Sequence, residues 1–107
     1  MPGFLANHDA LKTKGIDTIA CISVNDAFVM GAWGKNQGTG EKVMMLGDGN
    51  GEFTEKMGLT LDATRNGMGK RSQRYAMVVE DGVIKQLHVE APGAFEVSSA
   101  EAVLKGL

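Results

Sequence analysis

The feature that most constrains the fold is the apolar stretch TIACISV at 18–24. Its residues are apolar or small at both alternating sets of positions, which is typical of a strand that helices cover on both sides of a parallel sheet. Asn25 and Asp26 follow, and either side chain can accept hydrogen bonds from the free amides of a following helix. The sequence therefore predicts a strand over 17–24 that leads directly into a helix over about 27–37.

The rest of the chain predicts short helices and strands in alternation. Apolar spacing and turn residues indicate a helix over 3–14, a strand over 43–46, a helix over 52–57, and strands over 73–79 and 83–89 joined by Glu80-Asp81-Gly82. Ser98-Ser99-Ala100-Glu101 has the pattern of a capping box that opens a final helix. This order predicts an α/β thioredoxin-like fold with a mixed sheet flanked by helices, built as a single domain over residues 1–107.

Two of these helices have apolar residues that we expect to face the core. In the helix over 27–37 they are Phe28, Val29, Ala32 and Trp33. In the helix over 3–14 they are Phe4, Leu5 and Leu11, with Gly15 at the C-cap position. His8 lies between Phe4 and Leu11 and has no partner at metal-ligand spacing, so we expect a structural histidine.

Composition excludes several classes of protein. The formal net charge of -2 gives no electrostatic reason to expect nucleic acid as a partner. No apolar run approaches the roughly 20 residues that span a bilayer, so we expect no membrane segment. The single cysteine cannot form an internal disulfide, which favours a reducing compartment, and we expect the cytoplasm.

Two glycine-rich stretches resemble ligand-binding loops only weakly. Asp48-Gly49-Asn50-Gly51-Glu52 fails as a calcium loop because Phe53 and Leu59 stand where glycine and glutamate are required. Gly67-Met68-Gly69-Lys70 likewise lacks the residues of a phosphate loop on both sides. We therefore expect no metal site and no cofactor, and we interpret 48–52 as a loop that caps the helix over 52–57.

Several longer blocks carry a family resemblance. They are Gly15-Ile16-Asp17, residues 21–30 (CISVNDAFVM), Ala32-Trp33-Gly34, residues 48–54 (DGNGEFT), Gly67-Met68-Gly69, Arg71-Ser72, Arg74-Tyr75 and residues 92–101 (PGAFEVSSAE). In these blocks the chain resembles the type II, or atypical, peroxiredoxins of the AhpC/TSA redoxin family, essentially from residue 2 to residue 107. The resemblance implies a thioredoxin-like fold and a thiol peroxidase that reduces hydrogen peroxide and alkyl hydroperoxides. It also implies glutaredoxin, glutathione or thioredoxin as reductant, and a homodimer in many members.

The chain departs from the family pattern at its reactive cysteine. That cysteine lies in a Pro-Gly-Ala-Phe-Thr-Pro-Thr-Cys segment closely followed by His-Leu-Pro-Gly-Phe, of which only Pro2-Gly3-Phe4 is present here. The resemblance thus covers the C-terminal two-thirds of a family member, and we expect an N-terminally truncated chain without peroxidase activity of its own. Two explanations of the missing cysteine segment stay open: the gene is assigned a start that is too late, or the protein is genuinely short.

The resemblance also assigns the site residues. From the sequence alone, an arginine at the edge of a strand is expected to pair with a carboxylate. By resemblance, Arg74 instead stabilises the reactive thiolate and the peroxide, and Arg71 is a weaker candidate for a supporting role. Cys21 falls where some members, notably plant ones, carry a second cysteine. A lone cysteine inside an apolar strand is usually buried and unreactive, and we expect the same of Cys21.

Three functions stay open at this point. The chain is part of a complete peroxidase, a non-catalytic interaction module with a thioredoxin-like fold, or a small-ligand binder, which the failed phosphate motif disfavours. In the family a further strand lies between the strands at 17–24 and 74–79. Without it, we expect these two strands to pair directly, or the chain to associate with another chain or aggregate.

Overall fold

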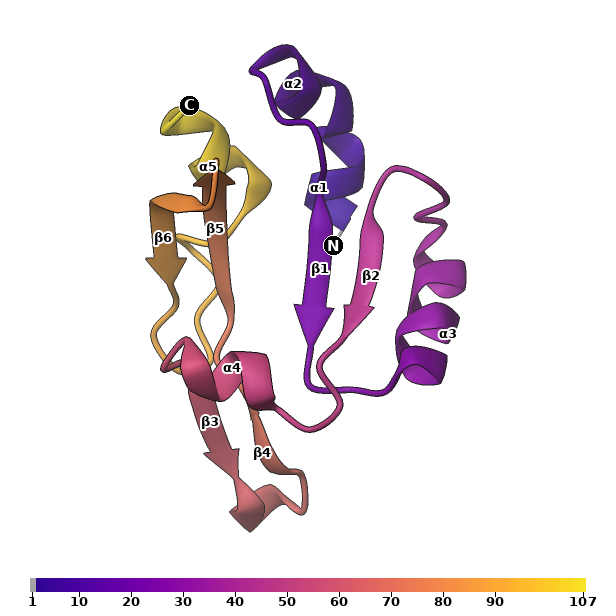
Figure 1. The fold of residues 1–107 in the computed structure, drawn as a ribbon, viewed down its shortest axis with the longest axis vertical. Helices are drawn as coiled ribbons and strands as arrows, with labels where there is room; N and C mark the ends of the chain where they lie inside the picture. Colours follow the sequence, from indigo (N-terminus) through magenta and orange to yellow (C-terminus); the bar gives the residue numbers. More distant parts are fainter. Residues whose placement is uncertain (1) are drawn as a thin grey trace. The chain divides into compact units, whose positions relative to one another are not determined.

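The computed structural model describes residues 2–107 as a mixed α/β chain (Figure 1). Its elements, in chain order, are α1 (Pro2–Ala6), α2 (His8–Thr13), β1 (Ala20–Ser23), α3 (Ala27–Gln37), β2 (Met44–Gly47), α4 (Glu52–Lys56), β3 (Thr60–Ala63), the 3-10 turn η1 (Thr64–Asn66), β4 (Gly69–Ser72), β5 (Tyr75–Glu80), β6 (Val83–Val89) and α5 (Ala100–Lys105). The strands pair as β1 with β2 in parallel, and as β3 with β4 and β5 with β6 in antiparallel fashion. The chain forms two compact units, one made of residues 18–73 and the other of the two terminal segments.

In the unit formed by residues 18–73, α3 connects the parallel strands β1 and β2. The predicted helix over 27–37 is confirmed. Of the two capping candidates, Asp26 is the N-cap and accepts a hydrogen bond from the Val29 amide at 2.8 Å, and Gly38, with a φ of 68°, is the C-cap. β1 is shorter than the predicted 17–24, because only Ala20–Ser23 finds partners along the four residues of β2.

The predicted inner face of α3 is wrong. Phe28 is 90% exposed and Val29 47% exposed, whereas Met30 and Gly34 are buried. A Cβ atom at Gly34 would lie 3.0 Å from Thr39 Oγ1 and 3.1 Å from Met45 Cγ, so this glycine lets α3 approach β2 closely. The helix therefore packs through Met30 and Gly34, and the most apolar stripe does not define its packed side.

The hairpin β3–β4 was not predicted, because its second strand, Gly-Lys-Arg-Ser, contains no apolar residue. The loop before α4 agrees with the prediction for 48–52. The buried Asp48 carboxylate accepts hydrogen bonds from the Phe53 amide, the Thr54 amide and the Thr54 hydroxyl, at 3.2, 2.9 and 2.7 Å. These bonds, the hydroxyl bond first, lower the pKa of Asp48 and fix the start of α4. Within residues 2–107, no cluster of His, Cys, Asp and Glu could hold a metal ion.

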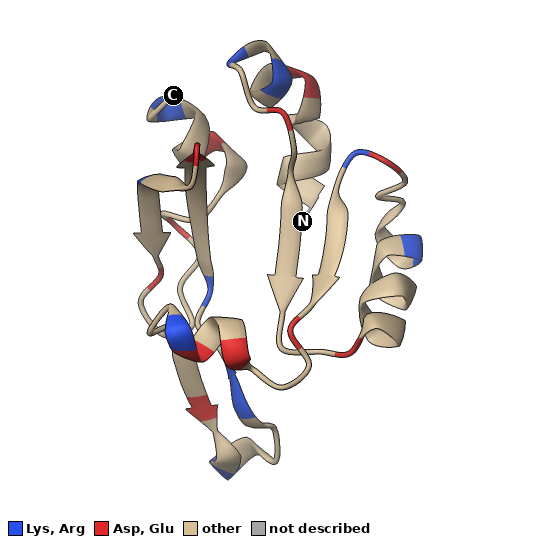
Figure 2. Cartoon of the chain, viewed as in Figure 1, with Lys and Arg blue, Asp and Glu red and all other residues tan. Residues whose placement is uncertain are grey.

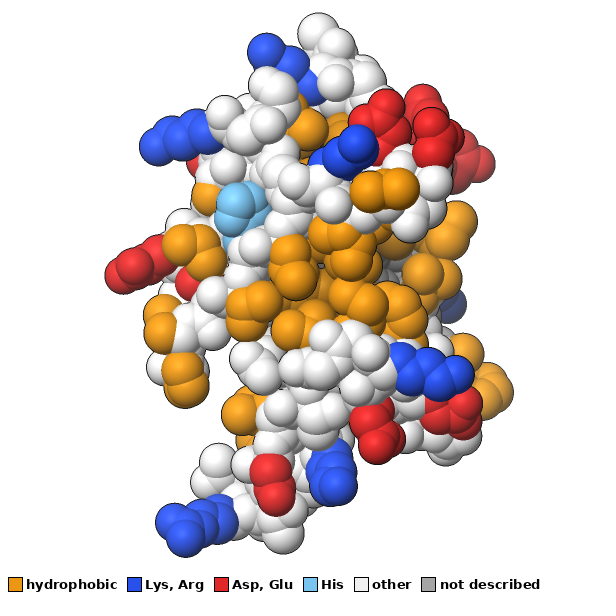
Figure 3. Space-filling model, turned by 60° about the vertical axis from the view of Figure 1, so that its left-hand side comes forward, with side chains coloured by type: hydrophobic (Ala, Val, Ile, Leu, Met, Phe, Trp, Pro, Cys, Tyr) orange, Lys and Arg blue, Asp and Glu red, His pale blue; other side chains and the backbone are white. Residues whose placement is uncertain are grey.

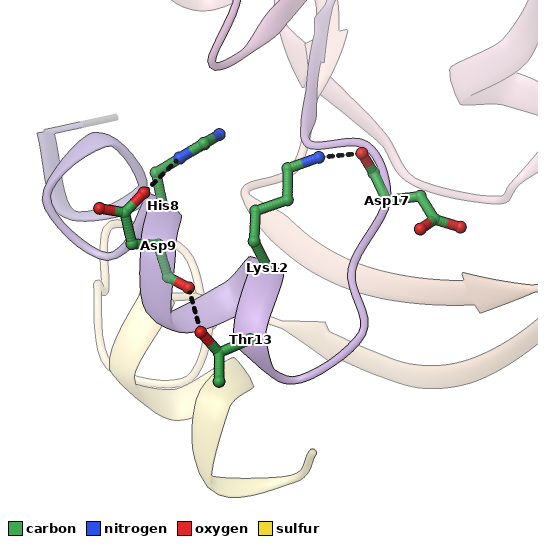
Figure 4. Close-up of polar contacts among 5 residues, drawn as sticks. All are labelled: His8, Asp9, Lys12, Thr13 and Asp17. Carbon is green, nitrogen blue, oxygen red and sulfur yellow. Dashed lines mark hydrogen bonds and ion pairs between the residues drawn. The ribbon is translucent and has the colours of Figure 1, made fainter.

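In the unit formed by the terminal segments, the predicted helix over 3–14 is divided at Asn7. The side-chain amide of Asn7 donates to the Gly3 carbonyl at 2.8 Å and to Glu101 Oε1 at 3.3 Å, which links α1 to α5. Leu11 is buried as expected, and Gly15, with a φ of 96°, follows the C-cap Lys14. Figure 4 shows the polar contacts around α2: His8 with Asp9, Thr13 with the Asp9 carbonyl, and Lys12 with the Asp17 carbonyl.

The β5–β6 hairpin confirms the predicted strand pair. Asp81 and Gly82 form its two-residue loop with φ values of 51° and 77°, which matches the twist that a tight hairpin needs. The capping box is wrong in detail, because Ser99 caps α5 by accepting from the Ala102 amide at 3.1 Å, while the Ser98 hydroxyl donates to Glu90. Ala100 and Val103 are the buried residues of α5.

The strands at 17–24 and 74–79 belong to different units, so their direct pairing stays a prediction. Within its own unit, β1 pairs with β2 and β5 pairs with β6. Each of these two strands thus has a strand partner along one edge in its own unit.

The surface carries mixed charge and many apolar side chains. Acidic and basic residues occur on the same elements, as on α4 (Figure 2), which agrees with the small net charge. Hydrophobic side chains cover a broad area in Figure 3. Met44 and Met68 are 53% and 49% exposed, whereas Met30 is 1% exposed.

Candidate functional site

Arg74 lies just before β5, where the chain continues the β5–β6 pairing by one more hydrogen bond. Its main-chain carbonyl accepts from the Glu90 amide at 2.9 Å. Its side chain is exposed, and the guanidinium carbon lies 5.0 Å from the centre of the Phe95 ring. A cation over an aromatic face at this distance is attracted by the ring quadrupole, by about 0.5–1 kcal/mol at an exposed site.

The contact with Phe95 leaves the hydrogen-bonding capacity of Arg74 unused. A guanidinium has five N–H donors, and a cation–π contact engages none of them. Within residues 2–107, the Arg74 side chain has no salt bridge and no hydrogen bond, so the expected carboxylate partner is not found. Arg74 thus presents a positive charge and free donors, which is what an anionic ligand requires.

The Phe95 ring belongs to a loop that a buried carboxylate organises. Glu90 is 6% exposed, and its Oε2 atom accepts four hydrogen bonds, from the amides of Glu96, Val97 and Ser98 and from the Ser98 hydroxyl, at 2.6–3.0 Å. Burial opposes ionisation, but these bonds prevail and lower the pKa of Glu90 to about 2. Sequence reasoning missed Glu90, because a glutamate at the end of a strand followed by Ala-Pro-Gly fits no site pattern.

Arg71 uses its donors within the unit of residues 18–73. Its Nε donates to the Met68 carbonyl at 2.9 Å, and its Nη1 donates to the Val24 carbonyl at 2.8 Å and to Asn25 Oδ1 at 3.1 Å. These bonds attach β4 to the residues that follow β1. The side chain is thereby fixed by its own fold, in contrast to that of Arg74.

Cys21 lies in β1, opposite Met45 of β2, and is half-buried rather than buried. Burial raises the pKa of its thiol. Because the thiolate is the nucleophilic form, a raised pKa disfavours reactivity near neutral pH.

The comparison with protein families decides what kind of protein this is. The family model described as Redoxin matches residues 1–104. The chain belongs to the redoxin family. Its relatives in that family are type II peroxiredoxins: it is 56% identical to "Peroxiredoxin-2E, chloroplastic" of Arabidopsis thaliana, covering all of this chain and 47% of that relative. It is 46% identical to "Peroxiredoxin-2B" of the same organism, covering all of this chain and 66% of that relative.

Solved peroxiredoxin structures confirm the thioredoxin-like fold. The crystal structure of reduced Prx3 in complex with H2O2 from Vibrio vulnificus is 52% identical, with a TM-score of 0.94, and the match covers 99% of this chain and 68% of that one. Peroxiredoxin 5 from Alvinella pompejana is 40% identical, with a TM-score of 0.88, over 98% of this chain and 65% of that one.

The peroxiredoxin chain spans about half the length of the curated relative that it matches at 56% identity. No helix within residues 2–107 has the length and apolar character needed to cross a membrane.

Proposed function

We propose that this chain supplies the arginine side of a thiol peroxidase active site. The observation that carries the proposal is Arg74, an exposed cation that rests on Phe95 and keeps its donors unpaired among residues 2–107. The proposed substrates are hydrogen peroxide and alkyl hydroperoxides. The proposed reductant is glutaredoxin with glutathione, or thioredoxin, and the proposed assembly is a homodimer.

In the proposed reaction, a thiolate attacks one peroxide oxygen. The sulfur–oxygen bond forms as the oxygen–oxygen bond breaks, so that sulfur is oxidised to sulfenic acid and the peroxide is reduced to water or an alcohol after proton uptake. Arg74 favours the thiolate by its charge and donates hydrogen bonds to the oxygen that gains negative charge. A reductant thiol then condenses with the sulfenic acid, which forms a mixed disulfide and releases water. A second reductant thiol cleaves this disulfide, which restores the thiol and leaves the reductant as a disulfide.

Cys21 does not fit the role of the attacking thiol, because burial raises the pKa of its thiol. We therefore propose that the 107-residue chain alone has negligible peroxidase activity. Peroxide turnover by this chain that disappears in Cys21→Ser would overturn this part of the proposal.

The test uses the native protein as its own cell produces it. An intact mass several kilodaltons above the 11.3 kDa of this chain is expected, together with peroxide consumption that depends on a thiol reductant. Arg74→Gln should lower the rate constant for peroxide by about 100- to 1000-fold, the usual cost of a lost charge-stabilising donor. Arg65→Gln, at an exposed arginine in η1, is the matched control and should leave the rate unchanged. An unchanged rate in Arg74→Gln would contradict the proposed role.

A second candidate is a non-catalytic interaction module. It is favoured by the adjacent side chains of Phe28 and Val29, which are 90% and 47% exposed at the start of α3, because contiguous apolar side chains at a surface are typical of contact sites. A native protein with the mass of this chain and no peroxide consumption would favour this candidate.

The cytoplasm remains the predicted location. This prediction rests on the single cysteine. The chloroplast is the alternative location, because the relative at 56% identity bears the word chloroplastic in its name.

A further inference from the structure

Glu90 is a buried charged group that the proposed reaction does not use. It follows β6 directly. One of its two carboxylate oxygens, Oε2, accepts all four hydrogen bonds that residues 96–98 donate to the side chain. A carboxylate can serve four converging donors because it is an acceptor only. A glutamine could place its amide oxygen at the same point, but a neutral oxygen accepts these four bonds more weakly than a carboxylate does. The charge of Glu90 is therefore part of the structure of this loop.

The main-chain amide and the carboxylate of Glu90 bind on the two sides of the contact between Arg74 and Phe95. Its main-chain amide donates to the Arg74 carbonyl at 2.9 Å. Its carboxylate binds the amide of Glu96, the residue directly after Phe95, at 2.8 Å. Phe95 itself is 59% exposed, so packing alone holds its ring weakly. Glu90 thus fixes the backbone on both sides of the contact between the Arg74 guanidinium and the Phe95 ring.

We propose that Glu90 is a positioning residue for Arg74: it holds the Phe95 ring against the guanidinium and so keeps the arginine donors in one orientation. The importance of this for peroxide rests on the proposed function of Arg74. A free arginine side chain has many rotamers, and confining it before the ligand binds removes much of the entropic cost of binding. The depressed pKa of Glu90 agrees with this role, because the carboxylate stays ionised throughout the physiological pH range.

The test is nuclear magnetic resonance of the arginine side chains in the full 107-residue chain. A proton near the face of an aromatic ring is displaced by the ring current, and Arg74→Lys identifies the signal of Arg74 Nε–H. Phe95→Leu should abolish the displacement. Glu90→Gln should reduce the displacement, because a neutral oxygen holds the loop more weakly. Glu96→Gln should retain the displacement, because this variant makes the same chemical change at an exposed glutamate of the same loop.

The outcomes separate positioning from general loss of structure. A Glu90→Gln chain that keeps its backbone spectrum and also keeps the displaced Arg74 signal would overturn the proposal, as would an unchanged signal in Phe95→Leu. If Glu90→Gln does not fold, Ser98→Ala removes only one of the four bonds. A partial loss of the displacement in Ser98→Ala then supports the proposal, and an unchanged signal overturns it.

Peroxide turnover is a separate measurement on the native protein. If Arg74→Gln leaves turnover unchanged while Glu90→Gln still releases the Arg74 signal, the proposed function fails and the positioning by Glu90 stands.

Discussion

Only two residues separate Arg71 from Arg74 in the sequence, yet the two arginines use their charge in different ways. Arg71 donates three hydrogen bonds to groups in its own unit, including the Val24 carbonyl. Arg74 rests on Phe95 and has no polar partner among residues 2–107. The sequence alone predicts a carboxylate partner for Arg74, and only the family resemblance separates the two. The partners of an arginine depend on residues far away in the sequence, such as Phe95, which local patterns do not reveal.

Cys21 should react slowly at neutral pH. Because burial raises the pKa of its thiol, alkylation by iodoacetamide at pH 7 should be slower than for glutathione, and the rate should rise with pH to a midpoint above that of an ordinary cysteine. The same chain in denaturant is the control, and there the rate should approach that of a free thiol. Fast alkylation of the folded chain, with a midpoint below the ordinary value, would contradict this.

Glu90 should contribute to stability in a defined range of pH. Its pKa is about 2 in the folded chain and 4.5 as the ordinary value. A carboxyl group with a depressed folded pKa stabilises the fold above the unfolded pKa, and this contribution is lost as the pH falls through the folded pKa. The free energy of unfolding, measured with denaturant from pH 6 to pH 2, should therefore fall less steeply in Glu90→Gln than in the unmodified chain. Glu96→Gln should follow the unmodified chain, and parallel curves for all three would argue against the assigned pKa.

At the scale of single elements, the start of α3 and the turn of the β5–β6 hairpin are predicted from the sequence, whereas the start of β1 and the break at Asn7 are not. Asp26 and the Asp81-Gly82 loop act through neighbours a few residues away, so their residue types suffice. The packed side of α3 and the β3–β4 hairpin are not predicted, because each is decided by a distant segment: Met45 lies against Gly34, and β4 pairs with β3 without apolar residues of its own.

Gly47, the last residue of β2, should not tolerate a side chain. A Cβ atom there would lie 2.8 Å from the Asn25 carbonyl oxygen, which belongs to the backbone and cannot turn aside. Gly47→Ala should therefore lower the free energy of unfolding by about 1–3 kcal/mol, as overpacking does. Gly31→Ala is the control: it lies within α3 with nothing within 4 Å, and it should be neutral or stabilise by up to about 1 kcal/mol. Equal effects of the two substitutions in denaturant titrations would refute this explanation.

For the whole molecule, the family resemblance gives the thioredoxin-like fold, and the solved relatives confirm it. The pairing of strands is less predictable. Within their units, β1 pairs with β2 across a helix, and β5 pairs with β6 across two residues. Which strands meet depends on the whole set of strands present, and this cannot be calculated from any one segment.

The free edges of β1 and β5 should make the isolated chain associate. Unpaired strand edges attract other strands, and a lysine in an edge strand prevents this. Sedimentation velocity over a range of concentrations should show oligomers for the 107-residue chain and fewer of them for Val79→Lys, in β5. Val97→Lys makes the same change at a similarly exposed valine outside the strands, and it should associate like the unmodified chain. A chain that stays monomeric at all concentrations would contradict the prediction.

The exposure of the methionines determines where peroxide would oxidise the protein first. Met44 and Met68 are about half exposed, whereas Met30 is enclosed, with its sulfur 3.9 Å from the Asn25 amide nitrogen. Peroxide converts accessible methionine into the polar sulfoxide, and repair enzymes reverse this lesion. In a cell under oxidative stress, the first damage would therefore fall on the surface, where it can be repaired, and the packing of α3 on its parallel strands would be the last to suffer.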